Sequence, residues 1–229
     1  MKKLLRNIGL TILFSGVLIF AFYLKNNEDL PTGKQGIEAD ALANKMLKAI
    51  NHNAYKNTRF LEWNFRGKHF YKWDKKNDIV KVSWDKNKVI LDIKSPQKSK
   101  VFIDGRQTFR VKLVDDAIKF FKNDRFWLVA PHTVFDNKTE RRLVKHNSKD
   151  ALLVTYNTGG NDNPKDSYLW ILDDNGMPTS YKMWVSIIPT DGMDATWSDW
   201  ITTASGTKLS RKHKMKKGEI DMGDVKGYN

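Results

Sequence analysis

The stretch from residue 165 to residue 189, in which two apolar runs flank a turn, constrains the fold most. The runs are Tyr168 to Leu172 and Tyr181 to Ile188, and Asp174-Asn175-Gly176 lies between them. Asn-Gly favours the positive φ of a tight turn, and aromatic and β-branched residues suit a strand, so the stretch predicts a β-hairpin. Large apolar side chains fall on both faces of both strands, whereas a sheet with one face in water alternates apolar and polar residues. Each face therefore needs a cover, which could be a second sheet, a helix or a ligand.

The composition limits the class of protein. The chain has 229 residues, 40% of them hydrophobic and 12% aromatic, which is enough for one sandwich or barrel domain, or at most two small ones. Lys and Arg number 40 against 26 Asp and Glu, so the net charge is +14. Such a charge attracts polyanions or an anionic membrane, although a solvated basic surface explains it equally well. The absence of cysteine excludes disulfides, thiolate nucleophiles, Cys-ligated metals and lipoprotein acylation.

Residues 1–25 predict a membrane anchor. Lys2, Lys3 and Arg6 precede a run from Ile8 to Leu24 that carries no charge. At about 1.5 Å per residue, this run just reaches across the hydrocarbon core of a bilayer, and no small-x-small cleavage site follows it. The basic flank places the N-terminus in the cytoplasm. We therefore expect a signal anchor in the inner membrane through residues 8–24, with the rest of the chain in the periplasm. The alternative is a cleaved signal peptide and a periplasmic protein.

The remaining chain divides into a linker and one domain. Residues 26–36 are polar and contain Pro31, Gly33 and Gly36, which predicts a linker. From Ile37 to Ile50, apolar residues recur every three or four positions and predict an amphipathic helix. A second, short helix is expected at residues 115–122. Strands are expected at residues 60–65, 69–73, 79–84, 89–93, 100–103, 109–111, 126–130, 142–145, 151–157, 195–202 and 208–212, and in the central hairpin.

This order of elements predicts a mainly β fold of the α+β class over residues 37–229. Because no βαβ alternation occurs, we expect a single antiparallel sheet, curled into a half-barrel or barrel, with two helices packed on one side.

Several stretches resemble a known group of envelope proteins. The helix, the meander, the Val101-Phe102-Ile103-Asp104-Gly105 strand and turn, and the closing hairpins resemble the LolA-like fold of periplasmic lipoprotein carriers. That resemblance implies an unclosed β-barrel with a helical lid over an apolar cavity, and the helix from Ile37 to Ile50 is the expected lid. Residues 126–132, 151–156, 167–170 and 182–189 are similar to an uncharacterised envelope-protein family of Gram-negative bacteria. The resemblance covers residues 39–213. Carriers of the LolA type are soluble, so an anchored chain departs from their pattern.

The sequence offers little for catalysis. No nucleophile elbow, phosphate-binding loop or dinucleotide fingerprint occurs, and no two of the five histidines lie within five residues of each other. We therefore expect no enzymatic activity, no cofactor and no metal. Residues 159–163 could hold an anion or calcium but are typical of a hairpin loop. Asp191 with Asp194, and Glu219, Asp221 and Asp224, could pair as carboxylates for acid-base chemistry, but all five are interpreted first as solvated charges. A hydrolase that uses Asp191 or Asp194 in a loop-built site is a further alternative.

Binding residues are suggested by the aromatic and the basic side chains. Eight tryptophans are present, and ordinary core packing or the lining of a cavity for an acyl chain would explain their places in predicted strands. The residues expected to line that cavity are Leu42, Met46, Leu47, Phe60, Trp63, Trp73, Trp84, Trp170 and Trp184. The residues expected to meet anionic lipid are Lys208, Arg211, Lys212, Lys214, Lys216 and Lys217, unless they form only a solvated strand end. No nucleic-acid motif accompanies them, so nucleic acid is not an expected partner.

Together these features predict a non-catalytic protein of the cell envelope that binds a lipid, an acylated ligand or another hydrophobic ligand in a half-barrel cavity. The alternative is a structural or interaction module that fills its own interior and binds another envelope protein.

Overall fold

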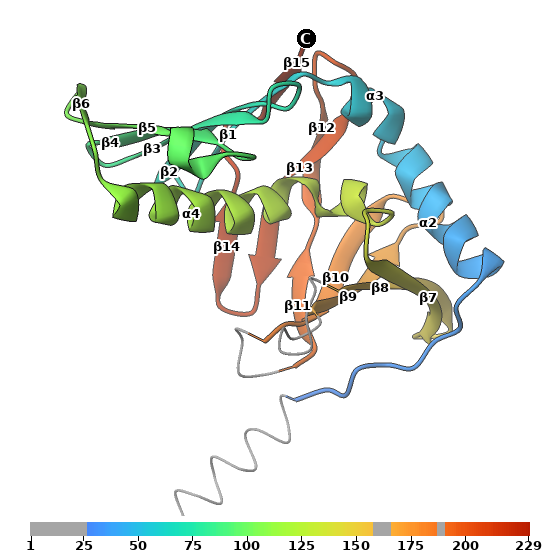
Figure 1. The fold of residues 1–229 in the computed structure, drawn as a ribbon. Helices are drawn as coiled ribbons and strands as arrows, with labels where there is room; N and C mark the ends of the chain where they lie inside the picture. Colours follow the sequence, from blue (N-terminus) through green and yellow to red (C-terminus); the bar gives the residue numbers. More distant parts are fainter. Residues whose placement is uncertain (1–26, 158–165, 187–190) are drawn as a thin grey trace, which may run out of the picture.

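The computed structural model describes residues 27–157, 166–186 and 191–229, and it contains two antiparallel sheets (Figure 1). The first sheet has seven strands in the order β15-β1-β2-β3-β4-β5-β6. The second has eight, in the order β12-β13-β11-β10-β9-β8-β7, with β14 beside β13. The strands of the first sheet are β1 (Phe60–Phe65), β2 (His69–Asp74), β3 (Ile79–Trp84), β4 (Asn87–Asp92), β5 (Lys100–Ile103), β6 (Arg106–Thr108) and β15 (Lys226–Tyr228). Those of the second are β7 (Thr139–His146), β8 (Lys149–Tyr156), β9 (Asp166–Leu172), β10 (Pro178–Trp184), β11 (Met193–Thr196), β12 (Ser198–Thr202), β13 (Lys208–Met215) and β14 (Gly218–Asp221).

The fold is mainly β and the sheets are not closed, as predicted, but the prediction of a single sheet is wrong. Helix α4 (Val111–Val129) separates β6 from β7, so the chain leaves the first sheet before it starts the second. The sheets meet where the end of β1 lies beside the end of β14 and the residue that follows it. There the amide of Asn64 donates to the Met222 carbonyl at 3.1 Å, and the amide of Arg66 donates to the Asp221 carbonyl at 2.8 Å.

The helices agree with the sequence pattern in part. Helix α2 (Ile37–Ala49) confirms the first predicted helix, and the short α3 (His52–Asn57) follows it. The second predicted helix, 115–122, is the middle of the 19-residue α4. Residues 111 and 126–129, which were expected in strands, therefore belong to this helix, and Ala130 starts the 3-10 turn η2 (Ala130–Thr133). Another 3-10 turn, η1 (Pro96–Lys98), precedes β5. The β preference of Phe126-Trp127-Leu128-Val129 is outweighed because Phe121 and Leu128, seven residues apart, are buried on the same helix.

The central hairpin is confirmed, and its two faces have different covers. Tyr168 and Trp170 on β9 and Tyr181 and Met183 on β10 belong to a buried cluster that also contains Met46 of α2. The opposite face belongs to a smaller cluster: Val144, Ala151, Leu153, Leu169 and Trp184. A helix therefore covers one face of the hairpin, as its two-sided apolar pattern requires.

The other face is contacted by the segment predicted as a linker. In its described part, residues 27–36, Trp184 Nε1 donates to the Glu28 carbonyl at 2.6 Å, and Lys34 pairs with Leu143 of β7. We call residues 27–36 the N-terminal strap. It is packed against the second sheet instead of extending away from it.

Helix α4 packs on the first sheet and contacts β13 of the second (Figure 1). Beneath it lies the largest buried cluster, to which Trp63, Tyr71, Trp73 and Trp84 contribute from the sheet and Phe121 from the helix. No helix of the described residues is both long and apolar enough to span a bilayer. The predicted anchor, residues 8–24, lies outside those residues.

Candidate functional site

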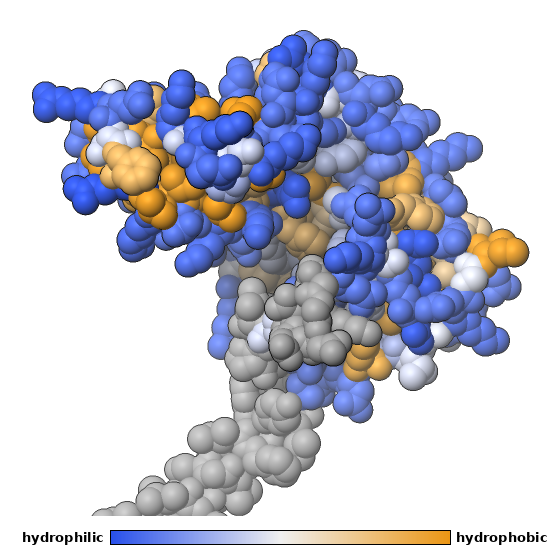
Figure 2. Space-filling model, in the orientation of Figure 1, coloured by the Kyte–Doolittle hydropathy of each residue, from blue (hydrophilic) through white to orange (hydrophobic). Residues whose placement is uncertain are grey.

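An apolar groove opens between the edge of the first sheet and the start of α4. It has a volume of about 260 Å³ and is lined by Pro96, Gln97, Ser99, Val101, Thr108, Phe109, Arg110, Val111, Val114 and Asp115. We call it the β6–α4 groove. Figure 2 shows apolar side chains gathered on this arm of the molecule, near the start of α4.

The local sequence explains why apolar side chains remain exposed there. Strand β6 has three residues and ends at Thr108, and α4 begins at Val111 without a side-chain cap. Phe109 in the connection is 84% exposed, and Val111 in the first turn is 58% exposed. The floor is apolar, since Val101 is buried at 3% exposure. Ligand sites are concave and mostly apolar, with a few polar groups that orient the ligand, and Arg110 and Asp115 are such groups here.

A second cavity, of about 430 Å³, lies along α2 and α3 and is chemically different. Its lining is Asn44, Leu47, Lys48, Asn51, His52, Asn53 and Lys56. Leu47 is the apolar member of that set, so this cavity is a polar surface cleft. It lies on the outer side of the helix that the sequence predicted as a lid, whose buried side chains are Ala39, Ala43 and Met46.

A polar cluster between α4 and β2 is internally satisfied. The carboxylate of Asp124, which is 2% exposed, accepts from the Tyr71 hydroxyl at 2.6 Å and lies 2.7 Å from His69 Nδ1. Its other oxygen accepts from Asn123 Nδ2 at 2.9 Å. Burial, followed by the negative charge of Asp124, raises the pKa of Tyr71. The described part of the chain places no serine or threonine in hydrogen-bond contact with Asp124, Tyr71 or His69, and the hydrogen bonds of this cluster join α4 to β2.

A stack of three rings lies where α3, η2 and β13 meet. Tyr55 and His132 stack with centroids 4.2 Å apart, and His52 stacks on His132 at 5.6 Å. Burial lowers the pKa of His132 to about 3, although its hydrogen bond to the Lys208 carbonyl acts in the opposite direction. Lys75 Nζ lies 3.7 Å from the Tyr55 centroid, and burial lowers the pKa of Lys75 to about 8. The neutral histidine and the packed rings stabilise the junction between the layers.

Three buried nitrogen atoms between α4 and the first sheet lack a hydrogen-bond partner among the described residues. They are Nε1 of Trp63, Nε1 of Trp73 and Nε of Arg125. The Arg125 guanidinium lies 5.6 Å from the centroid of Trp73 and 5.3 Å from that of Phe121. Each unsatisfied buried donor costs about 1–3 kcal/mol, so this layer could accept oxygen atoms that the fold itself does not supply.

The residues predicted to line one cavity are distributed over the molecule. Trp63, Trp73 and Trp84 lie beneath α4. Trp170 lies beneath α2, which itself carries the buried Met46 and the partly buried Leu42 and Leu47. Trp184 is on the opposite face of the hairpin, and Phe60 stacks on Tyr228 with centroids 5.2 Å apart. The structure therefore does not bring the nine together around one space, and their contact with a ligand stays a prediction.

The predicted basic surface follows β13 and its turn. Arg211 is paired with Asp199 at 2.9 Å and Lys212 with Glu219 at 3.7 Å, while Lys208, Lys214, Lys216 and Lys217 lie along the same strand and turn. Binding of anionic lipid there stays a prediction.

The acidic candidates are placed as follows. Asp194 lies 3.4 Å from Lys182, and the Asp191 carbonyl accepts from the amide of Glu28. Asp224 is paired with Lys226 at 2.9 Å, and Asp221 accepts from the amide of Gly223. Residues 159–163 lie outside the described residues. Across 27–157, 166–186 and 191–229, no three His, Asp or Glu side chains are grouped as a metal site would require.

Phe109 and Val111, the exposed large apolar side chains of the groove, are not among the predicted site residues. They follow the Asp104-Gly105 turn and were interpreted as a strand. A usable signal was present, because Val111, Val114, Ile118 and Phe121 are spaced by three, four and three positions, which is a helical pattern. This spacing would have started the helix at Val111 and left Phe109 in an exposed connection.

Comparison with known proteins gives one structural similarity. No family model matches the chain, and no curated protein matches it. It is similar to the crystal structure of an outer membrane lipoprotein-sorting protein domain from Vibrio parahaemolyticus, with 9% identity and a TM-score of 0.34 over 81% of this chain and 93% of that one. A TM-score at this level does not establish a common fold, so the LolA-like resemblance stays a prediction.

Proposed function

We propose that this chain is a non-catalytic protein of the cell envelope that binds the apolar chain of a lipid or an acylated ligand in the β6–α4 groove. The observation that carries the proposal is the groove itself, with Phe109 and Val111 exposed at its rim and Val101 on its floor. Pockets for small ligands usually measure about 300–1,000 Å³. At about 260 Å³ the groove suits one chain and not a whole lipid.

In this proposal the mobile cover is α4 and not α2. The groove lies at the first turns of α4. The nitrogens of Trp63, Trp73 and Arg125 that have no partner among the described residues lie between the later turns of α4 and the first sheet. A ligand whose chain enters the groove could present an ester or amide oxygen to these donors when α4 shifts. Satisfying them would offset part of the free energy needed to move the helix.

The proposed location is the periplasmic side of the inner membrane. The basic residues Lys2, Lys3 and Arg6, followed by the uncharged run from Ile8 to Leu24, support a signal anchor. A periplasmic protein after signal cleavage is the alternative, and groove binding is compatible with either.

Photo-crosslinking of the full chain tests the proposal. The protein is irradiated with a fatty acid that carries a diazirine in its chain, and adducts are mapped by mass spectrometry. We expect adducts within residues 96–115. Val111→Asp should reduce this labelling by roughly tenfold or more, because a charge is costly to bury in an apolar groove.

Ile37→Asp is the matched control. Ile37 is 89% exposed at the start of α2 and does not line the groove, so this variant introduces the same charge elsewhere. Its labelling should equal that of the wild type. Equal labelling of the wild type and Val111→Asp, with both proteins folded, would refute binding in the groove.

A structural or interaction module is the second candidate, and the packing beneath α2 favours it. Ala43 and Met46 of α2 and Trp170 of β9 are all 0% exposed, so side chains of the protein fill that side of the hairpin. This function predicts no specific adducts within residues 96–115 and no effect of Val111→Asp on labelling.

A further inference from the structure

The first sheet has a second face, opposite α4, that the described part of the chain leaves in contact with solvent. Figure 1 shows α4 along one face of this sheet, and that inner face carries the buried side chains of β1 to β5. On the outer face, Phe70 is 51% exposed, and Lys72 and Lys81 are exposed as well. This surface is separate from the β6–α4 groove.

The strand register gathers lysines on this outer face. Lys81 of β3 lies opposite Lys72 of β2 on one side and opposite Ile90 of β4 on the other. Ile90 in turn lies opposite Lys100 of β5, and Lys88 lies opposite Phe102. Lys72 and Lys81 are like charges directly across a strand pair, an arrangement that destabilises a sheet unless an anion lies beside it. An anionic partner would turn the repulsion into attraction.

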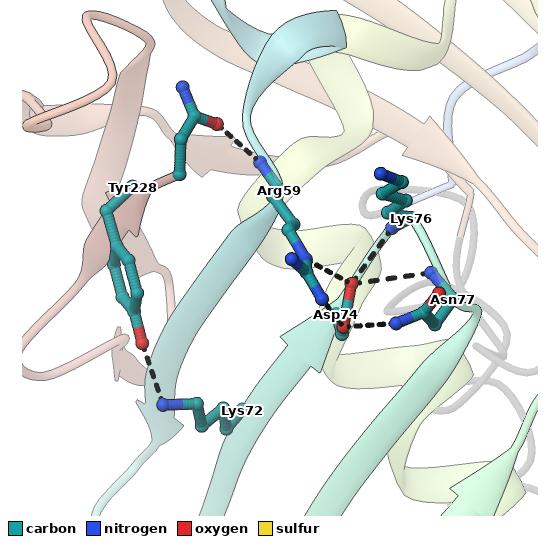
Figure 3. A network of polar contacts seen from close by, with 7 residues as sticks. Arg59, Lys72, Asp74, Lys76, Asn77 and Tyr228 are labelled. Atoms are coloured by element: carbon teal, nitrogen blue, oxygen red, sulfur yellow. Dashed lines mark hydrogen bonds and ion pairs between the residues drawn. The ribbon is translucent and has the colours of Figure 1, made fainter.

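The carboxylates of the same face are already paired with other groups. Asp74 holds the Arg59 guanidinium at 3.0 Å and Asn77 Nδ2 at 2.8 Å (Figure 3). These hydrogen bonds, that of Arg59 first, lower the pKa of Asp74. Glu62 accepts from Tyr228 and lies 2.9 Å from Lys72.

Asp92 is also engaged, because it accepts from the backbone amides of Lys94 and Ser95. Consequently, Lys81, Lys88 and Lys100 form no ion pair with any described residue. Lys81 and Lys100 are exposed, and the half-buried Lys88 lies over the Phe102 ring, which does not neutralise its charge. The positive charge of all three is therefore available to a partner.

We propose that the outer face of the first sheet lies on an anionic bilayer surface, with Lys81, Lys88 and Lys100 contacting lipid phosphates and Phe70 entering the interface. Clustered lysines strengthen attraction to anionic lipid by about fivefold each. An exposed aromatic ring beside lysines is typical of side chains at the membrane interface. The uncharged run from Ile8 to Leu24 would hold the domain near such a surface.

Single-stranded nucleic acid is the competing partner, and the ring geometry disfavours it. Such binding uses exposed rings on which bases stack. Here Phe60 and Tyr228 stack on each other, and Lys88 Nζ lies 4.6 Å from the centroid of Phe102. Phe70, at 51% exposure, is then the one exposed ring on the described outer face, whereas stacking of successive bases needs several such rings.

The test uses the absence of cysteine, which allows a single introduced cysteine to be labelled. Ser83 lies on the outer face between Phe70 and Lys88. Ser83→Cys is labelled with an environment-sensitive fluorophore, and the full chain is reconstituted in vesicles that contain a quenching lipid. We expect quenching when the vesicles contain phosphatidylglycerol, and little when they are pure phosphatidylcholine. High salt should reduce the effect, because it screens exposed charges.

Two triple variants complete the test. Lys81→Gln with Lys88→Gln and Lys100→Gln should lower the quenching to the level in neutral vesicles. Lys48→Gln with Lys119→Gln and Lys122→Gln changes the net charge by the same amount at exposed helix positions and should leave the quenching unchanged.

The position of the label supplies a further control, because a label at Asn44→Cys on α2 should not respond to phosphatidylglycerol. Equal quenching in both kinds of vesicle would overturn the proposal, as would equal effects of the two triple variants. Binding of single-stranded DNA that the first triple variant abolishes, without quenching by lipid, would also overturn it.

Discussion

Tyr71 donates its hydroxyl to Asp124 across 2.6 Å, and this hydrogen bond joins the first sheet to helix α4 in a buried layer. His69 approaches the same carboxylate oxygen at 2.7 Å. The sequence separates Asp124 from these two residues by 53 and 55 positions, so the contact exists only when α4 is docked on β2. The attachment of α4 therefore depends on polar groups as well as on the apolar cluster beneath it.

Tyr71→Phe should destabilise the protein by about 1.5–3 kcal/mol, because it removes a buried hydrogen bond to a charged group. Asp124→Ala should cost more, about 3–5 kcal/mol, since it leaves both Tyr71 and His69 without their acceptor. Urea denaturation followed by tryptophan fluorescence measures both. Lys119→Ala, at an exposed position of the same helix, is the control and should change stability by less than about 0.5 kcal/mol. If Tyr71→Phe had the same free energy of unfolding as the wild type, the hydrogen bond would not be what holds α4 in place.

The sequence pattern predicts local elements well and their assembly less well. Helix α2 and the central hairpin are confirmed because each has a clean period, of three to four residues in one and of two in the other. The strand β15 was not predicted, since its three residues are ordered by pairing with β1, more than 160 positions earlier in the chain. The two-sheet arrangement was missed for the same reason: local sequence does not state which strands pair at long range.

For the candidate binding site, the sequence predicted that the lining is apolar but not which residues form it. The aromatic strands indicated apolar surfaces, and Trp63, Trp73 and Trp170 are indeed buried, but in clusters that different helices cover. The groove depends on where β6 stops and α4 starts, which are boundaries that short patterns define poorly. The strap was expected to be a linker because its Pro and Gly residues suggest a flexible segment. Its pairing with Leu143 depends on the close approach of Gly33 to β7, which no local pattern encodes.

Stability should fall as the pH is lowered from about 6.5 to about 4. Burial lowers the pKa of His132 to about 3 and that of His213 to about 4, whereas an unfolded histidine titrates near 6.5. Within this window the unfolded chain binds more protons than the folded one, so protonation favours unfolding. Each histidine should contribute a slope of about 1.4 kcal/mol per pH unit.

Urea unfolding at a series of pH values checks this slope. His132→Gln should reduce it, whatever the variant does to the stability at neutral pH. Val154→Ala is the control, because it removes part of a fully buried side chain without removing a titrating group, and its slope should stay as in the wild type. An unchanged slope in His132→Gln would mean that His132 is accessible to protons in the folded protein.

Gly33→Ala should detach the strap from the edge of the second sheet. A Cβ atom at this position would lie 2.6 Å from the Leu143 carbonyl oxygen and 2.7 Å from Cγ2 of Val144, so the strap has to move. The Leu143 amide, which donates to the Lys34 carbonyl at 2.8 Å, should then exchange its hydrogen faster, by on the order of tenfold. Hydrogen exchange read by mass spectrometry measures this. Thr32→Ala changes an exposed neighbour and should have no such effect, and protection that persists in Gly33→Ala would argue against a docked strap.

Met46→Ala distinguishes a core helix from a ligand lid. Met46 is fully buried against the central hairpin, so its truncation should cost about 2–5 kcal/mol, while Leu42→Ala and Leu47→Ala, at partly buried positions, should cost less. Because α2 lies away from the β6–α4 groove, photo-labelling per folded molecule should be unchanged in all three (Figure 1). The measurements are thermal unfolding and labelling by the diazirine fatty acid, with Val154→Ala as the core control. If the α2 variants lost labelling at unchanged stability, the ligand would bind beneath α2, and the β6–α4 groove would not be its main binding site.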